Sequence, residues 1–280
     1  MEKYYHFTTV DTLVSMLTDS LKFEKNTSQR YIEFWATDIT VLNDTTERNL
    51  FVDLLVDKVR KYATEKKTKL TIAQEKELGK LCYSDMYVIS FTSTDLSLSD
   101  ELNMWRGYSG SGHGVCLELD FSKVPAFYVT NNDTYQMENT FRPQKCKYIN
   151  ADEIEIDKDL VMQLYEELNS SEKDYVKGTL AQSSLISRIA KIAPYYKHIA
   201  YKSEYEYRLV IPSLEEPQYK KIGNIIKPHI IYRIPISAIS SIKIGPCIKD
   251  SDSIKSLENF ILSKLGKEVE IKYSEIPFRG

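Results

Sequence analysis

Residues 241–273 have the sequence SIKIGPCIKDSDSIKSLENFILSKLGKEVEIKY, and this stretch decides the fold class. Its first four residues predict a short strand, and Gly245-Pro246 predicts a turn after that strand. Apolar residues then recur at helical spacing from 254 to 265, and Gly266 stands at the position expected for a helix stop. Residues 269–273 alternate between apolar and polar side chains, which is typical of a strand. A strand, a helix and a strand in succession indicate a protein built from both element types.

The rest of the chain continues this mixture of strands and helices. A helix is expected after Thr8, which would cap it with Asp11 as the partner three residues on. Further helices are expected at about 46–80, at 102–105 and over most of 152–200. Strands are expected at 4–7, 31–37, 86–92, 115–119, 205–212 and 228–235. No linker or repeat divides these segments. We therefore predict one α+β domain over 1–280, with a helical insertion at about 152–200.

Composition narrows the class of protein. The chain has 280 residues, a formal charge of -3, 42% hydrophobic and 28% charged residues, which is typical of a globular protein. Its apolar runs are far shorter than the ~20 residues that span a bilayer, and no secretion segment follows Met1. The four cysteines lie far apart without a Cys-x-x-Cys pair, which favours the reducing cytosol over a zinc ribbon. We expect a cytoplasmic protein with no membrane partner.

No strong catalytic signature is present, and the wide spacing of the four histidines argues against a metal site. Two weaker groups lie in the first fifth of the chain. His6 stands on a short strand before a helix, where an imidazole can bond a sugar hydroxyl or simply nearby backbone. Asn43-Asp44, followed by Glu47, is either a polar site or a plain turn and helix cap.

Two further groups lie later in the chain. Trp105 and Tyr108 precede the glycine-rich segment Ser109–Gly114, which contains His113 and could bring backbone close to a ligand or simply connect two elements. Glu204 and Glu206 stand two apart on a predicted strand, so both carboxylates point the same way. Arg208 follows on that strand, and the alternative is a surface ladder that Arg208 neutralises.

Taken in order, these segments resemble the bacterial family of domain of unknown function 2971 (DUF2971). The resemblance covers most of the chain except roughly 125–195. It rests on individually weak motifs in a matching order. They are His6-Phe7-Thr8, Asn43-Asp44, Ser90-Phe91, Met104-Trp105 with Tyr108, His113-Gly114-Val115, Glu206-Tyr207-Arg208 and Gly245-Pro246.

A looser resemblance concerns activity. A histidine at the end of a first strand, a helix directly after it and Glu-Tyr on a late strand are similar to the His-Tyr-Glu class of ADP-ribosyltransferases. This likeness implies a mixed, mostly antiparallel split sheet and NAD as substrate. It implies that His6 holds the adenosine-side ribose and that Glu206 stabilises the cationic nicotinamide ribose, with Glu204 as the alternative. Tyr108 and Trp35 compete for the ring that stacks on nicotinamide. The cofactor-binding set is expected to be His6, Phe7, Thr8, Trp35, Asn43, Trp105, Tyr108, His113 and Arg208.

Three functions follow as hypotheses. The first is an NAD-consuming ADP-ribosyltransferase-like enzyme, a toxin or phage-defence effector whose acceptor is nucleic acid, protein or water. The basic run from Lys58 to Lys80 would then face phosphates or only solvent. The second is a nucleotide-binding or interaction module without turnover. The third is a nuclease in which Asp44, Glu47 and Glu206 hold a divalent metal.

Overall fold

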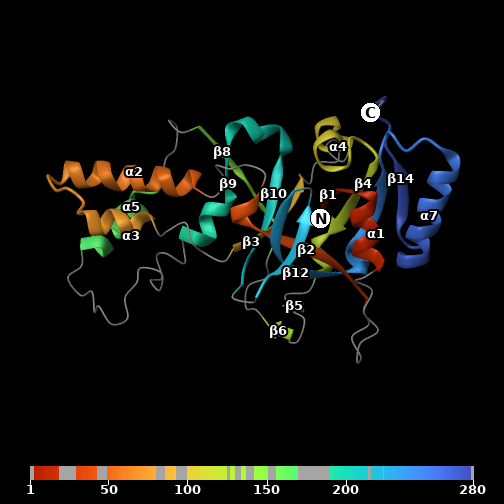
Figure 1. Ribbon diagram of the computed structural model, residues 1–280, viewed down its shortest axis with the longest axis horizontal. Coiled ribbons are helices and arrows are strands. Elements are labelled where there is room, and N and C mark those ends of the chain that lie inside the picture. Colours follow the sequence, from red (N-terminus) through yellow and green to blue (C-terminus); the bar gives the residue numbers. More distant parts are fainter. Residues whose placement is uncertain are drawn as a thin grey trace.

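The computed structural model describes residues 3–18, 30–42, 49–79, 86–92, 100–124, 127–129, 134–136, 142–150, 156–169, 189–213, 216–222 and 224–278. It confirms an α+β fold built on a ten-stranded, mostly antiparallel sheet. Figure 1 shows the sheet in the middle of the molecule, with α2, α3 and α5 gathered at one end and α7 at the other.

The elements follow one another in chain order. The first half of the chain contains β1 (Lys3–Thr9), α1 (Val10–Thr18), β2 (Tyr31–Asp38), η1 (Ile39–Val41), α2 (Leu50–Glu65), α3 (Ile72–Gly79), β3 (Met86–Thr92), α4 (Leu102–Tyr108), β4 (Gly114–Asp120), η4 (Phe121–Lys123), β5 (Phe127–Val129) and β6 (Thr134–Gln136). The second half contains β7 (Gln144–Lys145), β8 (Lys147–Ile149), α5 (Lys158–Asn169), η6 (Ala193–Tyr195), β9 (Tyr196–His198), η7 (Ile199–Glu204), β10 (Glu206–Pro212), β11 (Gln218–Ile222), β12 (Ile225–Pro235), η8 (Ile236–Ala238), β13 (Ile239–Ile244), α7 (Ser251–Leu265) and β14 (Glu270–Tyr273).

The main sheet runs in the order β11-β12-β2-β3-β1-β4-β13-β14, with β10 paired to β3 and β7 to β10. The segment 241–273 forms the predicted strand, helix and strand, and β13 and β14 pair in parallel because α7 carries the chain back. Two small sheets, β5-β6 and β8-β9, lie outside the main one.

The sheet forks at β3. One edge of β3 pairs with β10 along its whole length, from Met86 to Thr92. The other edge is shared, because β2 pairs only at Tyr87 and Val88 and β1 pairs only at Thr92. Between these two pairings β1 and β2 diverge, and Ser90 lies in the opening. The sheet therefore splits into a β2-β12-β11 arm and a β1-β4-β13-β14 arm.

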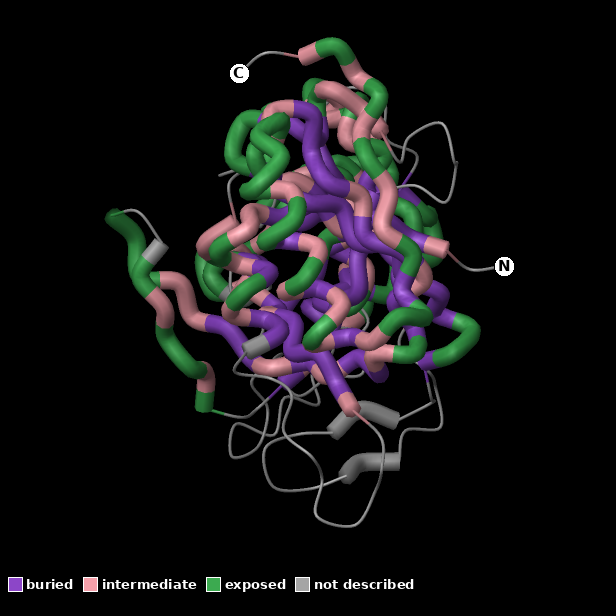
Figure 2. The backbone as a smooth tube through the Cα atoms, turned by 90° about the vertical axis from the view of Figure 1, so that its right-hand side faces the viewer, coloured by how far each residue is buried: buried purple, intermediate pink, exposed green. Residues whose placement is uncertain are grey.

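Apolar side chains cover both faces of the forked sheet. The largest core lies between the two arms, where β1, β2, β4, β12 and β13 meet α1 and α7, and it includes Leu17, Phe34, Leu117 and Ile261. A smaller core lies on the opposite face under α4, where Trp105 packs on Phe7. Figure 2 shows the buried residues concentrated in the middle of the molecule and the exposed residues mostly toward its outside.

Helices α2, α3 and α5 form a second body of packing, with a core of its own that includes Leu55, Leu78 and Leu164. The predicted insertion therefore draws on two parts of the chain, 50–79 and 156–169. The helical pattern predicted over about 46–80 forms two helices. A turn at Lys67, whose φ is 57°, separates α2 from α3. The predicted cap is also one residue off, because β1 extends to Thr9 and the Thr9 hydroxyl accepts the Thr12 N–H.

Candidate functional site

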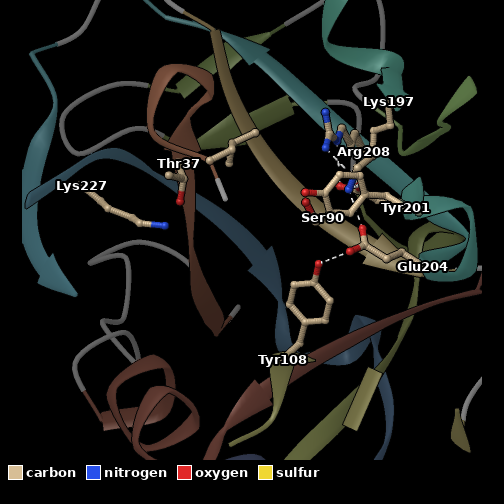
Figure 3. Close-up of a pocket in the computed structure, with 10 residues that line it drawn as sticks. Thr37, Ser90, Tyr108, Lys197, Tyr201, Glu204, Arg208 and Lys227 are labelled. Carbon is tan, nitrogen blue, oxygen red and sulfur yellow. Dashed lines mark hydrogen bonds and ion pairs between the residues drawn. The ribbon is translucent and has the colours of Figure 1, made fainter. Parts of the chain in front are cut away.

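A hollow of about 110 Å³ lies beside the fork in the sheet, on the α4 side (Figure 3). Thr37 and Lys227, from the β2-β12 arm, stand on one side of the hollow. Tyr108 and Glu204 stand on the other, and Ser90 lies between them. The hollow is therefore lined from segments that are distant in the sequence, and the fork is what brings them together.

Glu206 and Arg208 occupy alternate positions of β10, so both side chains point to the same face. Arg208 Nε and Nη2 donate to the two Glu206 carboxylate oxygens at 2.7 and 3.0 Å. Lys197 Nζ lies 2.7 Å from Glu206 Oε2. All three residues are buried, at 4% exposure for Glu206 and Lys197 and 1% for Arg208. The alternative of a surface ladder is wrong, because Arg208 and Glu206 pair inside the protein and Lys197 is a second cation of the group.

The two cations set the ionisation of Glu206. Burial raises the pKa of the Glu206 carboxyl, but the charges of Arg208 and Lys197 lower it more, and the result is a pKa of about 2. A guanidinium and an ammonium facing one carboxylate would leave an excess of positive charge. Glu204 removes that excess, because its Oε2 atom lies 2.5 Å from Lys197 Nζ. The four side chains balance as two cations and two anions.

Glu204 is the more accessible of the two carboxylates. Its side chain is 16% exposed, against 5% for that of Glu206. Tyr108 donates its hydroxyl to Glu204 Oε1 at 2.5 Å, and this contact is visible in Figure 3. Between the two carboxylates stands Tyr205, whose φ of 45° and ψ of 41° are left-handed. Glu204 therefore ends η7, outside the strand on which Glu206 begins.

The predicted aromatic residues differ in where their rings lie. Tyr108 lines the hollow, and burial together with the Glu204 charge raises the pKa of its hydroxyl. Trp105 is fully buried and donates its ring N–H to Asp100 at 2.8 Å. Trp35 lies on the β2-β12 arm, where Lys220 Nζ stands 3.5 Å from its ring centroid. Of these three rings, only that of Tyr108 lines the hollow.

His6 does not line the hollow. Its ring packs edge-on against Phe34 and Phe91, at centroid distances of 5.1 and 5.8 Å. Glu206 is paired with Thr92, the neighbour of Phe91, and so faces the other side of the sheet. A link remains through backbone, because His6 Nδ1 lies 2.9 Å from the carbonyl oxygen of Ser90. Burial lowers the pKa of His6, against the opposing effect of that carbonyl.

Three of the remaining predicted residues, Phe7, Thr8 and His113, do not line the hollow. Phe7 and Thr8 are buried in β1. His113 lines a second hollow of about 440 Å³ beside Cys247 and the start of α7, with its Nδ1 atom 3.2 Å from the Gly110 carbonyl. Asn43, Asp44 and Glu47 lie outside the residues that the structure describes.

Several residues of the hollow have no signal in the sequence. Lys197 stands in a segment expected to be helical, yet it lies on the short strand β9. Tyr201 lies under it, with Lys197 Nζ 4.8 Å from the ring centroid. Thr37 and Lys227 come from β2 and β12 and meet because His229 pairs with Thr37. A buried lysine is unusual enough to mark a site, but its burial becomes visible only in the fold.

The glycine motifs have a structural explanation. Three motif segments lie side by side, namely His6-Phe7-Thr8, His113-Gly114-Val115 and Gly245-Pro246. The Gly245 N–H donates to the Gly114 carbonyl at 2.9 Å, and Gly114 pairs with β1 next to Thr8. A Cβ atom on Gly114 would lie 2.2 Å from the Thr8 carbonyl oxygen, and one on Gly245 would lie 2.4 Å from the Gly112 carbonyl oxygen. Glycine is required at both positions because backbones approach closely, and no ligand is needed to account for it.

The described ranges contain no group of three or more His, Cys, Asp or Glu residues that could hold a metal ion. Within the same ranges, every helix is too short or too polar to cross a membrane.

Comparison with known proteins gives one finding. No curated protein and no solved structure matches the chain. The model of the family described as protein of unknown function (DUF2971) matches residues 104–209, a segment that begins within α4 and ends within β10. It includes Tyr108, Lys197, Glu204 and Glu206, which all line the hollow. The match supports the resemblance to that family within residues 104–209, which contain the motifs Met104-Trp105 with Tyr108, His113-Gly114-Val115 and Glu206-Tyr207-Arg208.

Proposed function

We propose that the protein is an NAD-consuming ADP-ribosyltransferase-like enzyme in which Glu204 is the carboxylate that meets the nicotinamide ribose. One observation supports this proposal above the others. Glu204 presents a partly exposed carboxylate to a hollow beside a fork in the sheet, and Tyr108 and Lys197 hold it in place. A forked sheet with an acid at its opening is the arrangement that the likeness to the His-Tyr-Glu class implies.

The chemistry asks for a carboxylate of this kind. Breaking the bond between nicotinamide and ribose leaves the bond's electron pair on the nicotinamide nitrogen, which becomes neutral, and develops positive charge on the ribose. A fixed anion stabilises that charge more than it stabilises the uncharged ribose of the ground state. An acceptor oxygen or nitrogen then bonds to the anomeric carbon and loses a proton to solvent.

Glu206 has a different part in this proposal. Both of its oxygens are engaged by Arg208, and Lys197 adds a third contact. A ligand hydroxyl would have to displace one of these buried contacts to reach it. Glu206 is therefore a positioning residue, which holds Lys197 where Lys197 can hold Glu204.

The aromatic rings of the hollow fit the same ligand. Tyr108 and Tyr201 both line it, whereas Trp35 does not. A planar nicotinamide would find a ring face on either tyrosine. His6 acts indirectly in this scheme, because its bond to the Ser90 carbonyl fixes the backbone at the opening of the fork.

Nicotinamide release from NAD is the direct test. The purified protein should release nicotinamide, and Glu204→Gln should abolish release. The variant should have a lower thermal midpoint, because one of the two anions that balance Lys197 and Arg208 is lost, but it should still be folded at the assay temperature. Glu75→Gln is the matched control, since Glu75 is a carboxylate paired with Arg60 far from the hollow on α3. Full activity in Glu204→Gln would remove Glu204 from the mechanism, and absence of release from the wild-type protein with any acceptor tried would overturn the enzyme proposal.

A second candidate is a nucleotide-binding module without turnover. The size of the hollow favours it, because about 110 Å³ is small beside the roughly 300–1,000 Å³ of most small-molecule sites. NAD would then raise the thermal midpoint of the protein without the release of nicotinamide.

An enzyme that consumes NAD in the cytosol would deplete the NAD of the cell. We therefore propose a toxin or defence role for the active enzyme.

A further inference from the structure

A cluster of basic and aromatic side chains adjoins the hollow on the β11-β12-β2 arm. Lys220 and Lys227 are direct cross-strand partners, and they lie on the same face as His229 and Trp35. We call Lys220, Lys227, His229 and Trp35 the lysine platform. Lys227 also lines the hollow, so the platform is continuous with the candidate site.

Like charges placed directly opposite one another across an antiparallel pair destabilise that pair. No acidic residue occurs between Pro217 and Tyr232, although the whole chain carries a formal charge of -3. Lysines on an edge strand can serve to prevent pairing with other chains, and β11 is the edge of the sheet. Lys227, however, lies on β12, one strand in from that edge. An anionic ligand lying across the Lys220–Lys227 pair would offset the repulsion between the two ammonium groups.

The aromatic side chains of the lysine platform indicate which kind of anion would bind there. Lys220 Nζ lies 3.5 Å from the Trp35 ring centroid, and the Trp35 and His229 rings are 4.9 Å apart. Burial lowers the pKa of His229, with the Lys220 charge acting in the same direction. If the Lys220 ammonium group moved to a phosphate, the face of the Trp35 ring would be free to stack on a nucleic-acid base. Basic side chains combined with an aromatic face are the means by which proteins bind single-stranded nucleic acid.

We propose that the lysine platform binds single-stranded nucleic acid and delivers it to the hollow as the acceptor. Phosphates would lie along Lys220 and Lys227, and a base would stack on Trp35. The acceptor role rests on the proposed function, whereas the binding itself does not. We prefer the platform to the basic run from Lys58 to Lys80 as the contact, because Arg60 in that run is already paired with Asp57 and Glu75.

Binding is tested without NAD. A fluorescein-labelled 20-nucleotide single strand should bind the full chain, and Lys220→Glu/Lys227→Glu should weaken binding at least tenfold. The slope of log K against log salt should fall in magnitude by about 1.4, as expected for the loss of two contacts to a single strand. The control is Lys61→Glu/Lys69→Glu, two exposed lysines of the α2 region, which should bind as the wild-type protein does.

A second readout uses tryptophan fluorescence. The chain has two tryptophans, and Trp105 is fully buried, so quenching by the oligonucleotide should report Trp35 and disappear in Trp35→Phe. Equal binding by wild type and the platform double variant would overturn the proposal. Tighter binding of a duplex, or equal competition by polyglutamate, would also overturn it. Nicotinamide release is measured separately on the wild-type protein without nucleic acid, so failure of the enzyme proposal and failure of this one are distinguishable.

Discussion

Tyr108 donates a 2.5 Å hydrogen bond to Glu204 across 96 positions of the sequence. The bond ties the end of α4 to the turn that precedes β10. Because burial and the neighbouring carboxylate raise the pKa of Tyr108, its hydroxyl stays protonated and acts as the donor at neutral pH. Glu204 thus has one oxygen directed by Tyr108 and the other by Lys197.

Replacement of Tyr108 by Phe should reduce nicotinamide release strongly while weakening the fold only slightly. The ring remains, but Glu204 loses one of its two directing contacts. We expect a stability loss near the lower end of the 1.5–3 kcal/mol range typical of hydrogen bonds to charged groups, so about 1.5 kcal/mol, because Tyr108 is 37% exposed. Release assays and urea unfolding measure the two effects.

The control for this substitution is Tyr273→Phe. Tyr273 also donates to a carboxylate, that of Glu258, but on the far side of the sheet at β14 and α7. Loss of that bond should leave nicotinamide release unchanged. Equal loss of activity in both variants would show that Tyr108 acts through general stability and not through Glu204.

Glu206→Gln should destabilise the protein by about 3 kcal/mol, since it leaves Arg208 and Lys197 buried with one anion between them. The same magnitude follows from titration. A carboxyl with a pKa of about 2 in place of about 4.5 stabilises the folded state by about 3 kcal/mol at neutral pH.

The pH dependence has a definite sign. The unfolded chain binds the proton more readily than the folded protein, so the contribution of Glu206 is complete above about pH 4.5 and is lost as the pH falls toward 2. Urea unfolding at pH 7, 4.5 and 3 should therefore show a loss in the wild type that Glu206→Gln lacks. Parallel curves for the two proteins would contradict the assignment.

The sequence was sufficient for the local elements. Residues 86–92 form β3 within the predicted bounds because β-branched and aromatic residues dominate that run. The strand, helix and strand over 241–273 also form as predicted, with Gly266 ending α7 at a φ of 93°. Glu204, Glu206 and Tyr108 were all predicted site residues and all line the hollow, but strand alternation does not account for Glu204, which ends η7 before β10 begins.

The fork and half of the hollow could not be predicted in this way. They depend on which strand pairs with which edge of β3, and those partners lie tens of residues apart. His6 illustrates the difficulty. The sequence predicts that His6 lies on a strand before a helix. It does not predict that the His6 ring contacts Phe34 on the face of the sheet opposite Glu206, because that depends on the register between three strands. Lys197 was missed because its burial is produced by residues that approach only in the folded chain.

The left-handed backbone of Tyr205 leads to a further prediction. A bulky residue at a φ of 45° is strained, and glycine adopts that conformation freely. Tyr205→Gly should therefore leave stability unchanged within about 0.5 kcal/mol, because relief of strain offsets the loss of a side chain that is 44% exposed. Tyr205→Val should cost about 1–2 kcal/mol, since a β-branched residue tolerates positive φ poorly.

Nicotinamide release by the Tyr205 variants shows whether the left-handed turn has a functional role in addition to its effect on stability. If the left-handed turn serves to aim Glu204, Tyr205→Gly should retain nicotinamide release and Tyr205→Val should lose it. Equal stability of the glycine and valine variants would show that the turn at Tyr205 is not strained.

The last prediction concerns Gly114, at the start of β4. A Cβ atom there would lie 2.2 Å from the Thr8 carbonyl oxygen and 2.7 Å from the Ser109 Cβ, and neither the backbone of β1 nor the fully buried Ser109 can yield easily. Gly114→Ala should therefore destabilise the protein by more than 3 kcal/mol or prevent folding. Gly107→Ala is the matched control, because Gly107 lies in α4 with no atom within 4 Å of its added Cβ. That variant should be more stable by up to about 1 kcal/mol, the helix preference for alanine over glycine. Thermal and urea unfolding of the two variants test whether Gly114 is required for the close packing of β1 against β4 or for contact with a ligand. If Gly114 served only a ligand, Gly114→Ala would fold with the stability of the wild type.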